Sequence, residues 1–398
     1  MYRDATVGVV VPAYNEEGFV GDVLRDIPDF VDRVYAIDDC STDGTWSEIL
    51  DAASVAVCGN GAGKLQYRDE RPDAHGSFLR EPEASRSVVQ TFEDRIDTIE
   101  SRNDLVAIAH TENFGAGGAI KTGYLAALVD GIDITVTIDA DGQMDPRIMN
   151  RLVKPVVDGR VEYTKGTRLV DGRHWREMPP VRAFGNTVLT CMTKVASGYW
   201  PMTDSQNGYT AISLDALQRI GVENLFEYYA YCNAVLVRLN TQNAPIADVE
   251  VPTTYGEETS NIEISTFLTK VTPMLAERFL WRLRTELVAD KSSLVALLYL
   301  VGVVCLLIGS VLLTPLCRLV TGRRSYRGAA ETLGAGALSL TVAMVVERTA
   351  SADLVEVVLP RTTTAGEVND DPVFAIGTVS PPTPCPRAWV PLLDTDQL

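Results

Sequence analysis

Two carboxylates, Asp139 and Asp141, are separated by one residue and follow a short apolar run, Ile134–Ile138. Gln143 stands two positions further on. The apolar run is typical of a buried strand, and oxygen ligands at a strand end can reach a hard cation such as Mg²⁺ or Mn²⁺. Such a cation neutralises the charge that develops on a departing diphosphate. A solvated turn is the alternative for the pair taken alone.

Two earlier apolar runs also end in polar residues. Pro12 closes the first, and Tyr14 and Glu16 follow it. Tyr14 could stack on a nucleobase and Glu16 could contact a ribose. Asp39 follows the second run and could accept hydrogen bonds from a base or ribose. Ser41, Thr42 and Asp43 could cap the next helix.

A glycine-rich turn follows another apolar run, Leu105–Ala109. It extends from Asn113 to Gly118. Glycine has no Cβ, so its backbone can approach a ligand closely. The turn is therefore a further candidate for contact with a ligand.

The elements that must position these residues alternate between strand and helix. Strands are expected at Thr6–Val11, Arg33–Ile37, Leu105–Ala109, Ile134–Ile138, Val161–Thr164 and Ala244–Val251. Helices are expected at Asn15–Ile27, Thr45–Ala53, Ala119–Val129, Arg147–Val157 and Arg182–Ser197. Alternation of this kind predicts an open α/β sheet with its site at the carboxyl edge of the strands.

We expect residues 1–262 to form this domain. Residues 58–104 interrupt its rhythm and are interpreted as an insertion, with a helix expected at Ser87–Ser101. The region 263–291 mixes aromatic and aliphatic residues with arginine, which suits a helix lying in a membrane interface. A helix packed on the domain fits this pattern as well, and both interpretations stay open.

Two apolar segments are candidates for membrane helices. The segment 292–317 contains Leu294–Leu313, which carries no charge and is long enough to span a bilayer. The segment 329–347 is rich in Gly and Ala, as in a helical hairpin with small residues at its interface. The loop 318–328 between them is rich in Arg, which conflicts with the positive-inside tendency if the front domain is cytoplasmic. Either the second segment does not span, or the folded domain decides the orientation.

The composition excludes some classes of protein. The net charge of -18 argues against a protein that coats nucleic acid. Lysine is scarce and aspartate abundant, which favours a halophilic, salt-rich cytoplasm over an ordinary acidic protein. The seven cysteines form no CxxC pair, which indicates a reducing compartment. We expect no signal peptide, and a poorly ordered tail at 348–398, which is rich in Pro and Thr.

Taken in this order, the strand ends resemble the nucleotide-binding half of a family 2 glycosyltransferase. Residues 5–57 and 105–260 carry the resemblance, and the motifs are most similar to the dolichyl-phosphate mannose/glucose synthases, notably the archaeal enzymes of protein N-glycosylation. The resemblance implies an α/β fold of the GT-A (nucleotide-diphospho-sugar transferase) class, an open sheet with C-terminal membrane helices.

The resemblance also implies roles for individual residues. Those matching nucleotide-sugar positions are Pro12, Tyr14, Glu16, Asp39, Ser41, Asn113, Gly118 and Asp139. Those matching metal contacts are Asp139, Asp141 and Gln143, with Mg²⁺ or Mn²⁺ as the cofactor. Those matching catalytic positions are Asp141, Arg168, Arg182 and Asp204, with Arg168 near the diphosphate and Arg182 facing the acceptor phosphate.

These expectations describe an enzyme that transfers one hexose, with inversion, from a donor of the UDP-glucose or GDP-mannose class to dolichyl or polyprenyl phosphate. Such a phosphate is already anionic and needs little help from a base. Arginines suit its planar geometry. His110 and His174 have no evident partner in the sequence, which favours solvated or structural roles for them. The expected location is the cell membrane, with the catalytic domain cytoplasmic; the oligomeric state stays open.

Other functions compete with this one. A glycosyltransferase that extends a lipid-linked oligosaccharide would share the same donor site. A haloacid-dehalogenase-like phosphatase has a similar acidic motif, but the downstream Lys and paired acidic motif are not found. A processive synthase normally carries Gln-x-x-Arg-Trp, which does not occur here. A membrane-bound sugar-nucleotide sensor or scaffold is the alternative that is not an enzyme. Cys40, where Gly is usual, and the less basic turn at 114–116 leave the sugar open.

Overall fold

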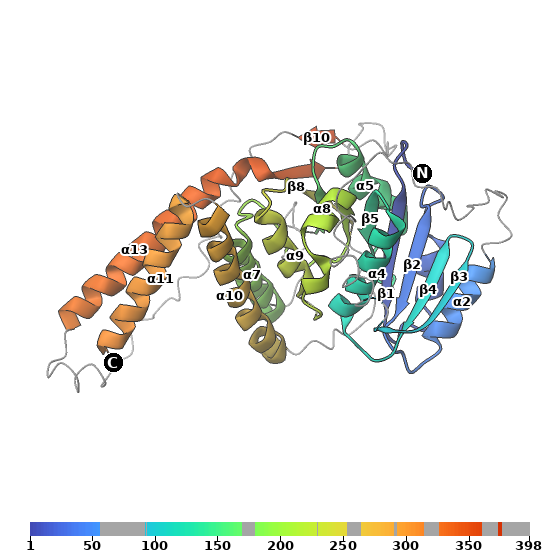
Figure 1. Ribbon diagram of the computed structural model, residues 1–398, viewed down its shortest axis with the longest axis horizontal. Coiled ribbons are helices and arrows are strands. Elements are labelled where there is room, and N and C mark those ends of the chain that lie inside the picture. Colours follow the sequence, from blue (N-terminus) through green and yellow to red (C-terminus); the bar gives the residue numbers. More distant parts are fainter. Residues whose placement is uncertain are drawn as a thin grey trace, which may run out of the picture.

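The computed structural model describes residues 1–55, 92, 94–168, 180–228, 230–252, 264–289, 293–313, 326–359 and 373–375. Its centre is one mixed β-sheet (Figure 1). The strands are β1 (Val7–Ala13), β2 (Arg33–Asp38), β3 (Ile96–Arg102), β4 (Leu105–His110), β5 (Ile134–Thr137), β6 (Tyr163–Thr167), β7 (Thr210–Ser213), β8 (Ile246–Glu250), β9 (Val355–Leu359) and β10 (Val373–Ala375). Their order across the sheet is β10-β9-β8-β6-β7-β5-β1-β2-β4-β3.

Strand direction decides which residues meet. The pairings give β1, β2, β4, β5, β6, β8 and β9 one common direction. Strands β3, β7 and β10 run the opposite way. The carboxyl ends of β5 and β6 therefore lie at the same edge as the turn that precedes β7. The segments after residues 137 and 167 and the segment before residue 210 consequently converge there.

Helices cover both faces of the sheet, except for the last two along the chain, which project from the domain (Figure 1). They are α1 (Val20–Arg25), α2 (Thr45–Val55), α4 (Ala116–Asp130), α5 (Met149–Val157), α7 (Pro180–Ser197), α8 (Leu214–Arg219), α9 (Tyr231–Asn240), α10 (Ile264–Ala289), α11 (Leu294–Leu313) and α13 (Tyr326–Ala350), with short 3₁₀ turns η3 (Pro146–Ile148), η4 (Val222–Asn224) and η5 (Ala352–Leu354).

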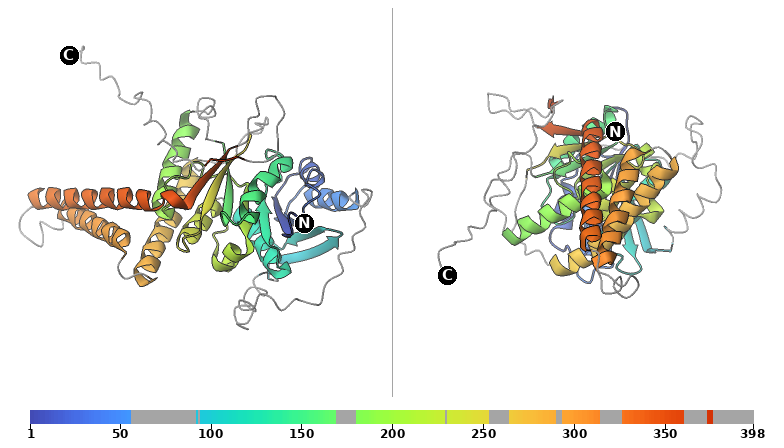
Figure 2. Two further views of the ribbon diagram at one scale, coloured as in Figure 1. Left: turned by 90° about the horizontal axis from the view of Figure 1, so that it is seen from above. Right: turned by 90° about the vertical axis from the view of Figure 1, so that its left-hand side faces the viewer.

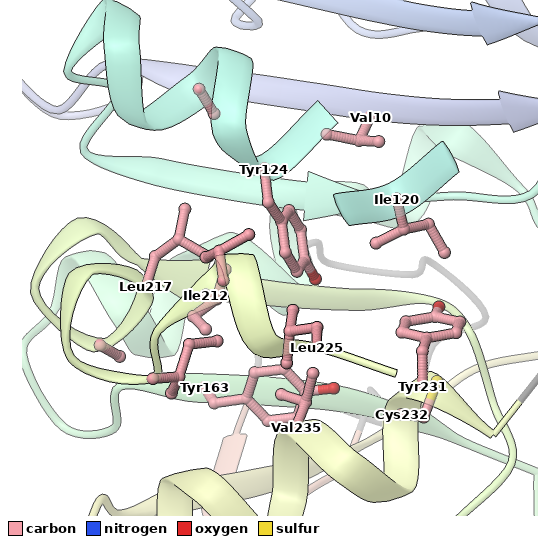
Figure 3. Close-up of a cluster of buried hydrophobic side chains, with 14 of the residues drawn as sticks. Val10, Ile120, Tyr124, Tyr163, Ile212, Leu217, Leu225, Tyr231, Cys232 and Val235 are labelled. Atoms are coloured by element: carbon pink, nitrogen blue, oxygen red, sulfur yellow. The ribbon is translucent and has the colours of Figure 1, made fainter. Parts of the chain in front are cut away.

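The alternation of side chains along β1 separates two cores. Val10 joins the cluster between the sheet and α4, α8 and α9, where Tyr124 and Tyr163 are buried (Figure 3). Val9 and Val11 join the cluster on the other face, with residues of α1, α2 and α5. A strand buried on both faces has no polar side, which explains its continuous apolar sequence.

Most expected elements appear with small shifts in their boundaries, but two regions differ from prediction. The helix expected at Ser87–Ser101 is wrong from Ile96 onward, because Ile96–Arg102 forms β3, an edge strand antiparallel to β4. Residues 56–91 of the expected insertion lie outside the described residues. The expected disorder from 348 is also wrong for β9 and β10, since β9 pairs in parallel with β8.

Helices α11 and α13 lie side by side and project together from the domain on the side of α7 and α10 (Figures 1 and 2). Both are long and apolar enough to cross a membrane, by length and composition. Glycines bring them together, because a Cβ on Gly302 would lie 2.6 Å from Leu340 and one on Gly336 would lie 2.9 Å from the Gly302 carbonyl oxygen. Small residues permit this close approach of backbones.

Both ends of this helical hairpin are attached to the domain. Before it, α10 packs on α7 and α9 through the buried side chains of Val271, Met274 and Leu275. After it, the chain passes through η5 into β9. The packed interpretation of the 263–291 region therefore describes this face of α10, while Leu280 and Val288 remain exposed.

Substitution of Gly336 tests the packing of the hairpin. We expect Gly336→Leu to separate α11 from α13, because overpacking a tight contact costs about 1–3 kcal/mol. Gly334→Leu is the matched control on the same helix, since a Cβ there meets nothing within 4 Å. The measurement is the thermal unfolding midpoint in detergent. Equal midpoints for the two variants would contradict the packing.

Candidate active site

The acidic pair lies at the carboxyl end of β5, as the sequence predicted. Burial, and then the charge of Asp141, raise the pKa of the Asp139 carboxyl to about 7, while the charge of Arg168 opposes this shift. The Asp141 carboxylate accepts a hydrogen bond from the backbone N–H of Gln143 at 3.0 Å. Negative charge is therefore concentrated where the strand ends, which is the electrostatic condition for binding a cation.

The turn before β7 closes against this pair. A Cβ on Gly208 would lie 3.1 Å from the nearer carboxylate oxygen of Asp139 and 3.4 Å from the Tyr231 hydroxyl. The Tyr231 hydroxyl is buried and makes no hydrogen bond within the described part of the chain. Gly208 thus lets the turn pack directly on Asp139.

Arg168 follows β6 and lies close enough to Asp139 for its positive charge to act on that carboxyl. A pocket is lined by Gln143, Met144, Asp145, Ile148, Arg168, Asn207, Tyr209, Val251 and Pro252. It brings together one predicted metal contact, Gln143, and one predicted phosphate contact, Arg168. Asn207 fits over the backbone of Gly166, where a Cβ would lie 3.1 Å from its side-chain amide.

Asp204 lies in the same turn, which β6, β8 and α9 hold. The Thr203 hydroxyl lies 2.7 Å from the Thr167 hydroxyl of β6. Thr203 donates from its backbone N–H and its hydroxyl to Asp248 of β8, at 2.6 and 2.7 Å. The Asp204 carboxylate accepts from the Gln206 N–H at 3.0 Å, and the Gln206 amide donates to Asn233 of α9 at 3.0 Å. The structure therefore brings Asp204 into the vicinity of Asp139 and Arg168. Arg182 belongs to α7, but its side chain lies outside the described residues.

The loops after β1 and β2 bind each other. The Ser41 hydroxyl accepts from the Asn15 N–H at 2.9 Å, and the Asn15 side-chain oxygen accepts from the Thr42 N–H at 2.8 Å. Asp43, one of the three residues expected to cap α2, accepts from the Thr45 N–H at 3.0 Å. Tyr14 is 47% exposed beside these loops, which leaves its ring available for stacking.

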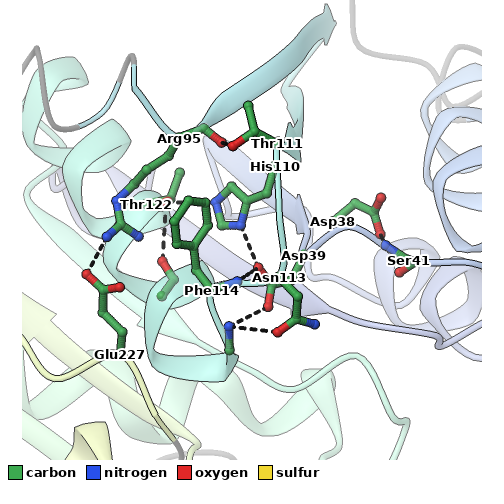
Figure 4. Close-up of polar contacts among 12 residues, drawn as sticks. Asp38, Asp39, Ser41, Arg95, His110, Thr111, Asn113, Phe114, Thr122 and Glu227 are labelled. Carbon is green, nitrogen blue, oxygen red and sulfur yellow. Dashed lines mark hydrogen bonds and ion pairs between the residues drawn. The ribbon is translucent and has the colours of Figure 1, made fainter.

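Asp39 is the centre of a buried network (Figure 4). Its carboxylate accepts backbone hydrogen bonds from Phe114 at 2.9 Å and Gly115 at 2.8 Å. The Nδ1 atom of His110 lies 2.7 Å from the same carboxylate, and its Nε2 atom lies 2.9 Å from the Thr122 hydroxyl. His110 therefore has a structural role, with a partner that the sequence did not reveal. It orients the carboxylate that is predicted to bind the donor.

Another segment of the chain crosses closely over the glycine-rich turn. This contact explains the glycines without the approach of a ligand. A Cβ on Gly117 would lie 2.5 Å from the carbonyl oxygen of Phe226, and the Gly118 N–H donates to the Glu227 carbonyl at 3.2 Å. Burial opposes ionisation of the Glu227 side chain, but hydrogen bonds and charge from Lys121 and Arg95 lower its pKa. These two cations fix the crossing segment over the turn, next to Asn113.

Among the described residues, no three or more His, Cys, Asp or Glu side chains lie together in a group that could hold a metal. Any cation here would be held by Asp139 and Asp141 with neutral oxygens and oxygens of the ligand. That arrangement suits Mg²⁺ or Mn²⁺, which often share their coordination with substrate phosphates.

Comparison with known proteins decides the class. Residues 8–66 and 82–221 match Glycosyl transferase family 2, and together these make up half of the chain. The chain belongs to this family. The predicted enzyme class and α/β GT-A fold are thereby confirmed, and the phosphatase and scaffold interpretations are displaced.

Individual relatives share only a minority of their residues with this glycosyltransferase. A UDP-N-acetylglucosamine–dolichyl-phosphate N-acetylglucosaminyltransferase of Methanococcus voltae is 27% identical over 64% of this chain and 88% of that protein. An undecaprenyl-phosphate mannosyltransferase of Micrococcus luteus is 29% identical over 41% of this chain and 66% of that protein. The match to the solved structure of glucosyl-3-phosphoglycerate synthase from Mycobacterium tuberculosis covers 70% of this chain and 80% of that protein's chain. The two are 17% identical, with a TM-score of 0.42.

His110 provides a test of the Asp39 network. We expect His110→Phe, which keeps the volume but loses both hydrogen bonds, to raise the KM for the donor about tenfold, since a buried carboxylate that loses a partner costs about 1–3 kcal/mol. His110→Gln keeps a donor and should recover part of this loss. Steady-state kinetics with each substrate varied in turn is the measurement. A change confined to the acceptor KM would contradict the assignment.

The raised pKa of Asp139 predicts how stability depends on pH. The pKa of Asp in an unfolded chain is about 3.9. The folded protein holds this proton more tightly, so the contribution of Asp139 is complete below about pH 3.9 and is lost as the pH rises toward about 7. Thermal unfolding in a chelator at pH 5 and pH 8 should therefore show a larger fall for the wild type than for Asp139→Asn. Equal falls would show that Asp139 does not titrate in this range.

Proposed function

We propose that this glycosyltransferase moves one sugar from a nucleotide-sugar donor to dolichyl or polyprenyl phosphate at a membrane. The observation that carries the proposal is the convergence of Asp139 and Asp141 with Arg168 and the Asp204 turn, in a domain that also bears an apolar hairpin. One molecule then carries carboxylates that can bind a cation, an arginine that can bind phosphate and a segment that can place the site at a membrane.

The relatives support the acceptor more than the sugar. One of them acts on dolichyl phosphate with N-acetylglucosamine, and another acts on undecaprenyl phosphate with mannose. Their names differ in the sugar but share a polyprenyl phosphate. We therefore keep UDP-glucose and GDP-mannose as donors and add UDP-N-acetylglucosamine. The expected place of this reaction in protein N-glycosylation stays a prediction.

Asp139, Asp141 and Gln143 would hold Mg²⁺ or Mn²⁺. The bound cation supplies Lewis-acid neutralisation of the diphosphate. Two observations support this fit. Burial beside a second carboxylate raises the pKa of Asp139, a penalty that a cation relieves, and the Tyr231 hydroxyl nearby makes no hydrogen bond within the described chain.

The proposed transfer balances without a catalytic base. An oxygen of the acceptor phosphate attacks the anomeric carbon while the bond from that carbon to the diphosphate breaks, so the configuration inverts. The attacking phosphate is already anionic at neutral pH. Arg168 offers planar N–H donors to phosphate oxygens, Arg182 is assigned to the acceptor phosphate, and Asp204 orients the acceptor side of the site. Asp39, Tyr14 and Glu16 bind the nucleoside.

The attachment of the hairpin supports the second of the two explanations left open for the arginine-rich loop, in which the folded domain decides the orientation. Since α10 enters the hairpin from the domain and β9 returns to the same sheet, both ends of the hairpin lie on the domain's side of a membrane. We place the catalytic domain in the cytoplasm. The positive-inside bias is counted over short loops and does not govern large domains, so the arginines of one short loop do not decide the orientation here.

A panel of labelled UDP-glucose, UDP-N-acetylglucosamine and GDP-mannose with dolichyl phosphate tests the proposal. We expect one donor to give a glycolipid in the presence of Mg²⁺ or Mn²⁺. Asp141→Asn should reduce the rate at least about a hundredfold, because it removes charge that acts on the developing transition state. Asp51→Asn, at an exposed position on α2, is the control. Label that enters only extended, acid-stable glycolipid would favour oligosaccharide extension instead.

A further inference from the structure

A buried polar cluster away from the active site lies where the hairpin joins the domain. Arg282 of α10 is fully buried, and its guanidinium donates to the Glu347 carboxylate of α13 at 2.7 Å. The other carboxylate oxygen of Glu347 accepts from the Tyr299 hydroxyl of α11 at 2.7 Å and from the Trp200 indole at 2.9 Å. We call these four residues the Glu347 clamp.

The clamp also holds the end of α7. The Arg282 guanidinium donates to the Val195 carbonyl at 3.2 Å and to the Asn240 side chain at 3.3 Å. Gly198 has a φ of +81°, and a Cβ there would collide with the Arg282 guanidinium. Three helices of the hairpin region and the end of α7 are thus joined through one ion pair.

Stability alone is a poor reason for such a cluster. An ionisable residue inside an apolar span is costly, and apolar side chains of similar volume commonly hold two helices as firmly as a buried ion pair. What directional hydrogen bonds add is one fixed geometry. Here they fix α11 and α13 relative to α7, the helix that begins close to Arg182.

We propose that Glu347 is a positioning residue for the lipid acceptor: the clamp holds the hairpin at one angle to the catalytic domain, so that a phosphate at the bilayer surface reaches the site. This inference rests on the proposed function. A membrane-embedded phosphate lies in a plane set by the bilayer, and the hairpin sets where the site lies relative to that plane. Misplacing a reacting group by about 1 Å can cost about a hundredfold in rate.

The clamp therefore affects one kind of acceptor only. A short-chain, water-soluble polyprenyl phosphate approaches the site from solution and does not depend on the angle of the hairpin. A merely structural role for Glu347 would weaken both reactions alike. The ratio of kcat/KM for the two acceptors separates positioning from stability.

The experiment uses the full-length protein in liposomes with Glu347→Gln. The acceptors are dolichyl phosphate in the same bilayer and geranyl phosphate in solution. We expect kcat/KM for dolichyl phosphate to fall about tenfold or more, with kcat/KM for geranyl phosphate and the KM for the donor changed by less than about twofold. Glu331→Gln is the control, because it breaks an exposed ion pair with Arg327 on the same helix.

Tyr299→Phe keeps the test decisive if Glu347→Gln does not fold, since it removes one hydroxyl and leaves the ion pair in place. It should shift the acceptor ratio in the same direction by a smaller factor. Equal losses with both acceptors, or no loss with either, would overturn the proposal. A wild-type protein that glycosylates neither acceptor would instead refute the proposed function itself.

Discussion

The reversed direction of β7 is the constraint on which the site depends. If β7 ran parallel to β5 and β6, the turn that contains Asp204 and Gly208 would lie at the opposite edge of the sheet. Because it runs back between them, that turn packs against Asp139, and Asn207 faces Arg168 across the pocket. Side chains from three distant parts of the sequence thereby form one site around a concentrated negative charge.

Local sequence predicted the parts of the site that depend on one strand and the turn after it. An apolar run followed by Asp139 and Asp141 needs no distant residue to be interpreted. The same holds for Tyr14 and for Asp39, whose strands are buried on both faces and are therefore continuously apolar. Family membership followed from the order of these local signals.

Contacts between distant residues were not predictable in this way. His110 and Asp39 are 71 residues apart, and nothing near His110 in the sequence indicates its partner. The glycines of this turn suggested the approach of a ligand, but at Gly115 and Gly117 a chain segment more than a hundred residues later leaves no room for a side chain. Strand β9 is five residues long in a tail rich in Pro and Thr, and its pairing with β8 becomes evident only after the hairpin has folded back.

We propose above all that the acceptor is a lipid monophosphate, which receives a single sugar at the edge where β5, β6 and the Asp204 turn meet. Mass spectrometry of the lipid product, after reaction with the active donor, tests it most directly. We predict the mass of dolichyl phosphate plus one sugar residue, with one phosphorus atom. A product that contains a diphosphate bridge, or more than one added sugar, would contradict the account.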